Sequence, residues 1–179
     1  MKKIYFILTY TGTVLSKVIK FTTKDEFSHV SISLDHDLKQ MYSFGRLNPY
    51  NPFFGGFVHE SPLNGTFKRF ENTTISKIYA LNITDDQYEI LKEKLELMCK
   101  HNKIYKFNIL GLIGAKFRYK IKRKNSYYCA EFIKDIMDES YIKNNLPKVA
   151  KPDDFKNIEN INLCYSGMLK DFLREKTMQ

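Results

Sequence analysis

Residues 27–34 alternate between apolar and polar side chains, and this stretch constrains the fold more than any other part of the chain. The apolar positions are Val30, Ile32 and Leu34, and the polar positions are His29, Ser31 and Ser33. Successive side chains of a β-strand point to opposite faces, so the pattern predicts a half-buried strand with one polar face. Residues 35–37 favour a turn and residues 40–44 a return strand. We therefore expect an antiparallel hairpin over residues 28–46.

The remaining patterns add both strands and helices to this hairpin. Residues 3–9 and 75–83 are rich in β-branched and aromatic side chains, which is typical of strands. Thr84 and Gln87 have the spacing of a capping box, which predicts a helix that runs to about Lys100. Further helices are expected at residues 13–21, at 126–137 and from about Gly167. The fold class predicted from these patterns is α+β.

Length and composition favour one soluble domain. A chain of 179 residues can bury one sizeable core but is short for two, so we expect a single domain over residues 1–179. Residues 4–8 are apolar, but the run is short and no small-residue cleavage site follows, so a signal peptide is not expected. No stretch is long and apolar enough to span a bilayer. A cytoplasmic protein is therefore expected.

The three cysteines, Cys99, Cys129 and Cys164, are far apart and show no C-x-x-C spacing, which argues against a zinc site or a disulfide framework. Cys129 differs from the other two because it falls in the first turn of the expected helix at 126–137. The helix dipole and unpaired backbone N–H groups there stabilise a thiolate, and the same N–H groups can hold an oxyanion. A buried structural cysteine is the alternative interpretation.

His29 is the candidate partner of this thiol, on the polar face of the expected strand. A lone histidine in a strand is usually structural. Beside a thiolate, however, an imidazolium can stabilise the sulfur, protonate a leaving group and later activate water. Cys129 and His29 together therefore predict a catalytic pair, which needs no metal and no organic cofactor.

The motifs Ser28-His29-Val30-Ser31-Ile32 and Tyr128-Cys129-Ala130-Glu131-Phe132 resemble those of the permuted papain-like, NlpC-type cysteine hydrolases, with the YiiX-like proteins as the nearest subgroup. The similarity covers most of residues 4–139. It implies a circularly permuted papain-like fold, in which the histidine strand precedes the cysteine helix and an antiparallel sheet packs against that helix. It also implies an amide substrate, such as a small peptide or a cell-wall-type γ-glutamyl linkage.

In that family a third polar residue, often Glu, orients the histidine from the next strand. If Leu34 pairs with Gln40, Ser43 lies on the same face as His29 and is the first candidate for this role. Glu60 and His59 are the reserve candidates. They lie in residues 47–72, an aromatic segment with three prolines that is expected to be a long loop flanking the site.

The charge of the chain leaves further functions open. The net charge of +9 favours anionic partners such as lipid headgroups, wall polymers or nucleic acid, and does not choose among them. A basic run precedes the cysteine helix: Lys116, Arg118, Lys120, Lys122, Arg123 and Lys124. Such a run is usually a solvated face, but it could recruit an anionic surface. The alternatives to an amidase are a lipid or ester acyl hydrolase or acyltransferase of the same fold, and a non-catalytic basic binding module. No specific nucleic acid is predicted as a partner.

Overall fold

A computed structural model describes residues 1–13, 16–17, 25–48 and 51–172, without the side chains of residues 51–54. Its strands are β1 (Lys2–Tyr10), β2 (His29–Ser33), β3 (Met41–Asn48), β4 (Asn51–Glu60), β5 (Ile75–Ile83), β6 (Lys106–Phe107), β7 (Ser126–Tyr127) and β8 (Asn162–Met168). Its helices are α2 (Gly65–Arg69), α3 (Asp85–Lys100), α4 (Ile109–Lys116) and α5 (Cys129–Glu139), with 3₁₀ turns η1 (Asn102–Ile104) and η2 (Pro152–Asn157).

Six of the strands form one antiparallel sheet in the order β4-β3-β2-β1-β5-β8. The centre of the sheet is β1, which pairs along its whole length with β5 and over residues 5–9 with β2. β6 and β7 form a separate parallel pair beside the cysteine helix. The expected α+β class is therefore confirmed.

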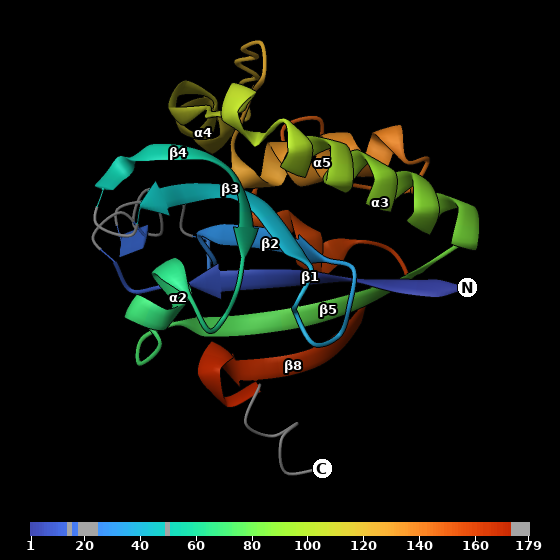
Figure 1. Ribbon diagram of the computed structural model, residues 1–179, viewed down its shortest axis with the longest axis horizontal. Helices are drawn as coiled ribbons and strands as arrows, with labels where there is room; N and C mark the ends of the chain where they lie inside the picture. The colour runs from blue at the N-terminus through green and yellow to red at the C-terminus, as the bar shows by residue number, and fades with distance from the viewer. Residues whose placement is uncertain (14–15, 18–24, 49–50, 173–179) are drawn as a thin grey trace.

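Each face of the sheet carries its own apolar core. On one face α3 and α5 lie side by side over the sheet (Figure 1), and Phe132 and Ile133 of α5 are buried there with Val30 and Ile32 of β2. A smaller core on the other face gathers around Ile7. The remaining members of this smaller core are Tyr5, Leu38, Met41, Phe67, Ile78, Ala80, Leu169 and Phe172. The predicted packing of the cysteine helix against an antiparallel sheet is confirmed.

The local patterns of the first hundred residues predict their elements well. The strands at residues 3–9 and 75–83 are β1 and β5, and β2 with β3 is the expected hairpin. The capping box is present: Oγ1 of Thr84 accepts a hydrogen bond from the N–H of Gln87, and the Gln87 side chain accepts one from the N–H of Thr84. The helix expected at residues 13–21 lies mostly outside the described residues.

Three predictions about local structure are wrong. Residues 51–60 are not loop but the edge strand β4, which pairs with β3. Residues 162–168, expected as loop and then helix, pair with the free edge of β5 as β8. The polar face of β2 is not solvated, because the second core covers it and leaves Ser31 and Ser33 fully buried. The neighbour of β8 is distant in sequence, whereas β4 pairs with β3, from which only residues 49–50 separate it.

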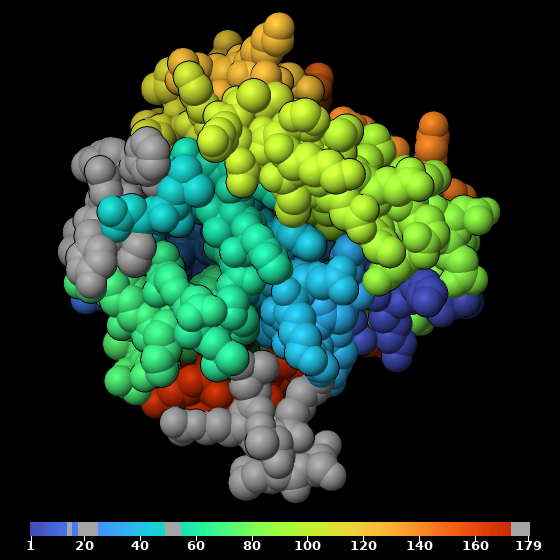
Figure 2. Space-filling view, viewed as in Figure 1, coloured from blue at the N-terminus to red at the C-terminus, as the bar shows by residue number. Residues whose placement is uncertain are grey.

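The face shown in Figure 2 presents the β3–β4 hairpin and α2 between the α3 side of the molecule and β8. β4, β3 and α2 also contribute side chains or backbone to the pocket described below. The pocket therefore lies at the end of the sheet that is next to α2 and α4.

Candidate active site

A single pocket brings together Cys129 of α5, His29 of β2 and Glu60 of β4. Its walls are completed by Phe67 of α2 and Leu112 of α4, among other residues. Three segments that are each about thirty or more positions apart in the chain therefore meet at one point. The expectation that Cys129 and His29 lie together agrees with this arrangement.

Cys129 is the first residue of α5, so it lies in the first turn as expected, although the helix begins at residue 129 and not at 126. The preceding Tyr128 is the N-cap but makes no side-chain capping bond, since its hydroxyl donates to the carbonyl of Ala150 at 3.0 Å. The first backbone N–H groups of a helix have no partner within the helix, so those of α5 point toward the region of the thiol. Buried Phe132 and Ile136 anchor the helix below the pocket.

His29 is the first residue of β2, where its backbone pairs with Thr9 of β1. Its Nε2 lies 2.9 Å from Oε1 and 3.2 Å from Oε2 of Glu60. Both side chains are largely shielded, with 19% of His29 and 11% of Glu60 exposed. Since Glu60 occupies Nε2, Nδ1 is the ring nitrogen that remains for the thiol of Cys129.

Glu60 is the last residue of β4 and reaches the site because β4 pairs in register with β3. The hydroxyl of Ser31 donates to Oε2 of Glu60 at 2.5 Å, which leaves Oε1 closest to the imidazole. Gly45 of β3 lies against the pair: a Cβ at this position would be 3.2 Å from Oε1 of Glu60 and 3.6 Å from Cε1 of His29. The lack of a side chain at Gly45 thus provides the space for the carboxylate.

The electrostatics of the pocket favour a charged imidazole. Burial by itself would lower the pKa of His29, but the charge of Glu60 and hydrogen bonding with Cys129 and Glu60 outweigh burial and raise the pKa to about 10. His29 is therefore an imidazolium at neutral pH, placed between a carboxylate and a thiol. Such a cation stabilises a neighbouring thiolate.

The expectation that Ser43 orients His29 is not met. The register behind it is correct, because the N–H of Leu34 donates to the carbonyl of Gln40. The Ser43 hydroxyl, however, donates to the carbonyl of Val30 at 2.7 Å and is fully buried, while the carboxylate of Glu60 occupies the position beside His29. Glu60, the reserve candidate, is the residue in contact.

His59, the other reserve candidate, lies outside the pocket. Its ring is exposed and stacks on Tyr42 with centroids 4.9 Å apart, and its Nε2 donates to the carbonyl of Lys39 at 2.7 Å. Side chains alternate along β4, so His59 and Glu60 point in opposite directions.

Sequence patterns missed several residues of the pocket. Thr11, Thr13 and Ser16 line it, and their hydroxyls are linked to one another by hydrogen bonds. Arg46 lines it from β3. The T-x-T-x-x-S spacing and the glycine before Arg46 are visible in the sequence. Neither feature indicates a pocket residue unless it is known which elements surround the thiol.

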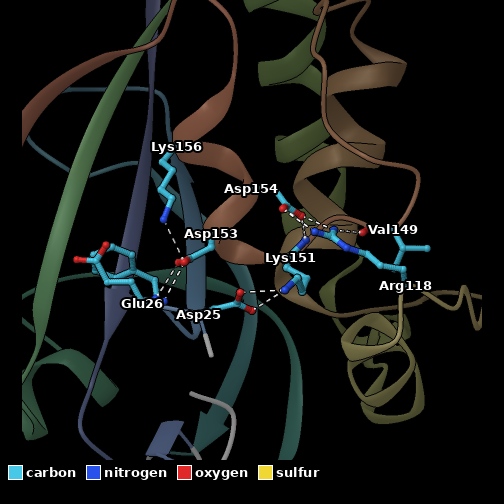
Figure 3. A network of polar contacts seen from close by, with 9 residues as sticks. Asp25, Glu26, Arg118, Val149, Lys151, Asp153, Asp154 and Lys156 are labelled. Carbon is cyan, nitrogen blue, oxygen red and sulfur yellow. Dashed lines mark hydrogen bonds and ion pairs between the residues drawn. The ribbon is translucent and has the colours of Figure 1, made fainter. Parts of the chain in front are cut away.

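A polar network fixes the segment that leads into β2 (Figure 3). The carboxylate of Asp153 in η2 accepts hydrogen bonds from the backbone N–H groups of Glu26 and Phe27, both at 2.8 Å. Beside it, Lys151 forms an ion pair with Asp25 at 2.9 Å. The two contacts hold residues 25–27 against η2 and so help to position His29, two residues further on.

The same network also reaches the segment after α4. The guanidinium of Arg118 donates to both carboxylate oxygens of Asp154 and to the carbonyl of Val149. Arg118 therefore has partners within the protein, although it belongs to the basic run.

The other two cysteines have no role in the pocket. Cys99 is half-buried on α3, where burial and the charge of Glu96 raise the pKa of its thiol. Cys164 is exposed on the edge strand β8.

No known protein-family profile and no curated protein matches this chain. Within residues 1–13, 16–17, 25–48 and 51–172, no cluster of His, Cys, Asp and Glu is arranged to bind a metal ion. Among the helices that the structure describes, none has the length and apolar character needed to cross a bilayer. The chemistry of the site therefore has to be argued from its own geometry.

Proposed function

We propose that this protein is a thiol hydrolase that cleaves an amide bond through an acyl-enzyme intermediate, with a permuted papain-like fold of the NlpC type. The observation that carries the proposal is the meeting of Cys129, His29 and Glu60 in one pocket, with His29 hydrogen-bonded to Glu60 and interacting with Cys129. Cys129 is the nucleophile, His29 the acid and base, and Glu60 holds the ring and stabilises its charge.

In the first step the thiolate of Cys129 attacks the carbonyl carbon of the substrate and forms a C–S bond. The carbonyl π electrons move to oxygen, and the oxyanion accepts a hydrogen bond from the backbone N–H of Cys129 at the start of α5. When the C–N bond breaks, His29 gives its proton to the departing nitrogen. The products of this step are a free amine and a thioester on Cys129.

In the second step His29, now neutral, takes a proton from a water molecule, which attacks the thioester carbonyl. The C–S bond breaks, the carboxylic acid leaves, and the proton held by His29 restores the imidazolium beside the thiolate. The raised pKa of His29 supports this cycle, because the imidazolium is the resting form of the ring at neutral pH.

The test is site-specific labelling with iodoacetamide, followed by mass spectrometry of all three cysteines. Cys129 is expected to react faster than a free cysteine at neutral pH, and His29→Ala should slow its labelling by about tenfold or more. Exposed Cys164 is the internal control, since its labelling should not respond to His29→Ala. Equal labelling of Cys129 with and without His29 would contradict the proposal.

A lipid or ester acyl hydrolase is the second candidate. Leu112 of α4 lines the pocket, and Leu110 and Ile113 of the same helix are exposed, so an acyl chain could reach the thiol along an apolar path. Incubation with N-acyl peptides and with phospholipids separates the candidates, because the acyl group trapped on Cys129 has a different mass in each case.

A further inference from the structure

Arg46 lies in the catalytic pocket as a cation without a directly bonded counter-ion. It is half-buried on β3, next to Gly45, and lines the same pocket as Cys129 and His29. Within the part of the chain that the structure describes, the guanidinium of Arg46 forms no hydrogen bond or ion pair; it lies over the ring of Phe70, 5.8 Å from the ring centroid. A guanidinium normally binds carboxylates through two parallel hydrogen bonds.

The nearest carboxylate, that of Glu60, is already engaged. Its oxygens accept hydrogen bonds from His29 and Ser31, and it influences Arg46 only through space. Burial lowers the pKa of Arg46, and Glu60 only opposes this effect by its charge. Of the segments whose side chains are not described, 14–15, 18–24 and 49–54 contain no Asp or Glu, and 173–179 contains Glu175. A carboxylate on a ligand would compensate the desolvated charge.

We infer that Arg46 binds a carboxylate of the substrate, so that the enzyme acts on acyl compounds with a free carboxylate close to the scissile bond. This inference rests on the proposed function and narrows its substrate class. The guanidinium would hold the carboxylate while the acyl carbon faces Cys129, and neutral analogues would lack this contact. Arg46 is therefore a residue that determines specificity.

Two alkylating reagents that differ in charge test this inference. Iodoacetate and iodoacetamide both form a C–S bond with the thiolate and release iodide, but only iodoacetate carries a carboxylate. In the wild type the ratio of the iodoacetate rate to the iodoacetamide rate should be higher at Cys129 than at a free cysteine. Arg46→Gln should lower this ratio by about tenfold. An unchanged ratio in Arg46→Gln would overturn the inference.

Arg69→Gln is the matched control. Arg69 also lies over the Phe70 ring, at 5.6 Å, and its loss removes the same charge, but Arg69 does not line the pocket. The ratio should be unaffected in this variant. Arg46→Lys, which keeps the charge but not the planar fork, should retain part of the preference. A loss of the preference in Arg69→Gln equal to that in Arg46→Gln would assign the effect to general charge and contradict a specific contact.

A binding measurement separates this inference from the proposed hydrolysis. N-acetylglycine and its neutral amide can be titrated into the Cys129→Ser protein and followed by NMR shifts. If N-acetylglycine bound but its amide did not, and if Arg46→Gln abolished this binding, the carboxylate site would be supported even if Cys129 proved unreactive. Equal binding of acid and amide would overturn it, even if Cys129 proved catalytic.

A second surface, on and just after α4, has unusual composition for a protein exterior. Five large apolar or aromatic side chains are exposed here: Ile109 (38%), Leu110 (51%), Ile113 (57%), Phe117 (71%) and Tyr119 (68%). We call these five residues the α4 surface. Ile109, Ile113 and Phe117 are spaced four residues apart, which brings them to one side of a helix. Soluble proteins rarely leave such a set of residues uncovered without a partner.

Basic residues flank the α4 surface in the sequence. Residues 103–130 contain no Asp or Glu, and their basic side chains are Lys103, Lys106, Lys116, Arg118, Lys120, Lys122, Arg123 and Lys124. Arg118 and Lys122 pair with Asp154 and Asp135. The other members form no ion pair with any residue that the structure describes. Apolar side chains among lysines are typical of segments that lie in the headgroup region of anionic membranes.

We propose that the α4 surface binds an anionic lipid bilayer, with its apolar side chains in the headgroup region and the surrounding lysines against lipid phosphates. In Figure 1 α4 lies on the side of the molecule opposite to β8, and the chain after it projects outward. Leu112 in the same helix lines the pocket, so a bound membrane would lie next to the site. This proposal does not depend on catalysis.

Co-sedimentation with vesicles tests this second proposal. Vesicles of phosphatidylcholine mixed with phosphatidylglycerol should bind the protein, and pure phosphatidylcholine vesicles should bind it far less. Leu110→Ser with Ile113→Ser should weaken binding by about tenfold or more, and Lys116→Gln with Lys124→Gln by about fivefold for each lysine. Leu163→Ser on β8, where the side chain is 55% exposed, is the matched control and should bind as the wild type does.

Three results would overturn the membrane proposal. Binding to anionic vesicles that is equally strong after Leu110→Ser with Ile113→Ser would mean that charge alone acts. A wild-type dimer that the same double variant abolishes, without any binding to vesicles, would assign the α4 surface to a second copy of this chain. Tight binding to nucleic acid in place of vesicles would likewise contradict it.

Discussion

Nε2 of His29 lies 2.9 Å from Oε1 of Glu60, and this contact joins the first residue of β2 to the last residue of β4. The contact fixes the plane of the imidazole and compensates its positive charge in a shielded environment. It also leaves Nδ1 of His29 for the thiol of Cys129. The charge and the orientation of the catalytic base therefore both depend on one carboxylate.

Glu60→Gln should reduce turnover of an acyl substrate by roughly 10²–10⁴-fold, because the amide keeps the shape of the side chain but not its charge. Labelling of Cys129 by iodoacetamide should slow as well. Ser43→Ala is the control, since the Ser43 hydroxyl is bonded to the carbonyl of Val30 and not to His29. If Ser43→Ala slowed labelling more than Glu60→Gln did, the assignment of Glu60 as the orienting residue would be wrong.

The pH dependence of stability follows from the pKa of His29, which is about 10 in the folded protein against an ordinary value of 6.5. The folded state holds the proton more tightly than the unfolded state. The resulting stabilisation is complete below about pH 6.5 and is lost as the pH rises toward about 10. Denaturant unfolding across this range should therefore show a decline in the free energy of unfolding.

Comparison of the wild type with His29→Gln shows how much of the decline in the free energy of unfolding comes from His29. Lysines and tyrosines elsewhere contribute equally in both proteins. The variant should show a shallower loss of stability between about pH 6.5 and 10 than the wild type. Parallel curves would mean that the imidazole does not carry the raised pKa.

Gly45→Ala should impair the site more than the fold. The added Cβ would be 3.2 Å from Oε1 of Glu60, so the carboxylate would have to move by a few tenths of an ångström away from the imidazole. We expect labelling of Cys129 to slow by about tenfold, since small displacements of catalytic groups are costly. Gly56→Ala is the comparison: its Cβ would be 2.9 Å from the carbonyl oxygen of Tyr105, so it should lower the melting temperature instead.

Local patterns predicted the elements that carry His29 and Cys129 because each pattern depends only on residues that are close together in the sequence. The alternation around His29 and the apolar stripe of Phe132, Ile133, Ile136 and Met137 each require only one strand or one helix to be recognised. The expected hairpin register, with Leu34 paired to Gln40, also agrees with the structure.

The identity of the third residue was not predictable in the same way. Glu60 reaches His29 through β4, whose proline and paired glycines are typical of a loop, and edge strands tolerate both residue types. The strand β8 was missed for a related reason, since its pairing with β5 joins residues more than eighty positions apart. Contacts of this kind depend on the assembled sheet and leave little trace in either segment alone.

Asp153 provides the last test, because it holds the segment before His29 without touching the pocket. Its carboxylate accepts hydrogen bonds from the N–H groups of Glu26 and Phe27 and pairs with Lys156 at 3.2 Å. Asp153→Ala leaves these backbone donors without their partner and should lower the free energy of unfolding by about 1–3 kcal/mol. Asp153→Asn keeps one acceptor oxygen and should lose less.

The control for Asp153 is Asp138→Ala on α5. Asp138 also bonds two partners, the side chains of Lys134 and Asn144, but its side chain is far more exposed to solvent, so its loss should cost about 1 kcal/mol or less. Chemical denaturation measures both variants, and iodoacetamide labelling shows whether the segment also positions the imidazole. Because Asp153 fixes the residues that enter β2 at His29, Asp153→Ala should slow labelling of Cys129 where Asp138→Ala does not. Equal labelling rates in the two variants would mean that β1 alone positions the start of β2.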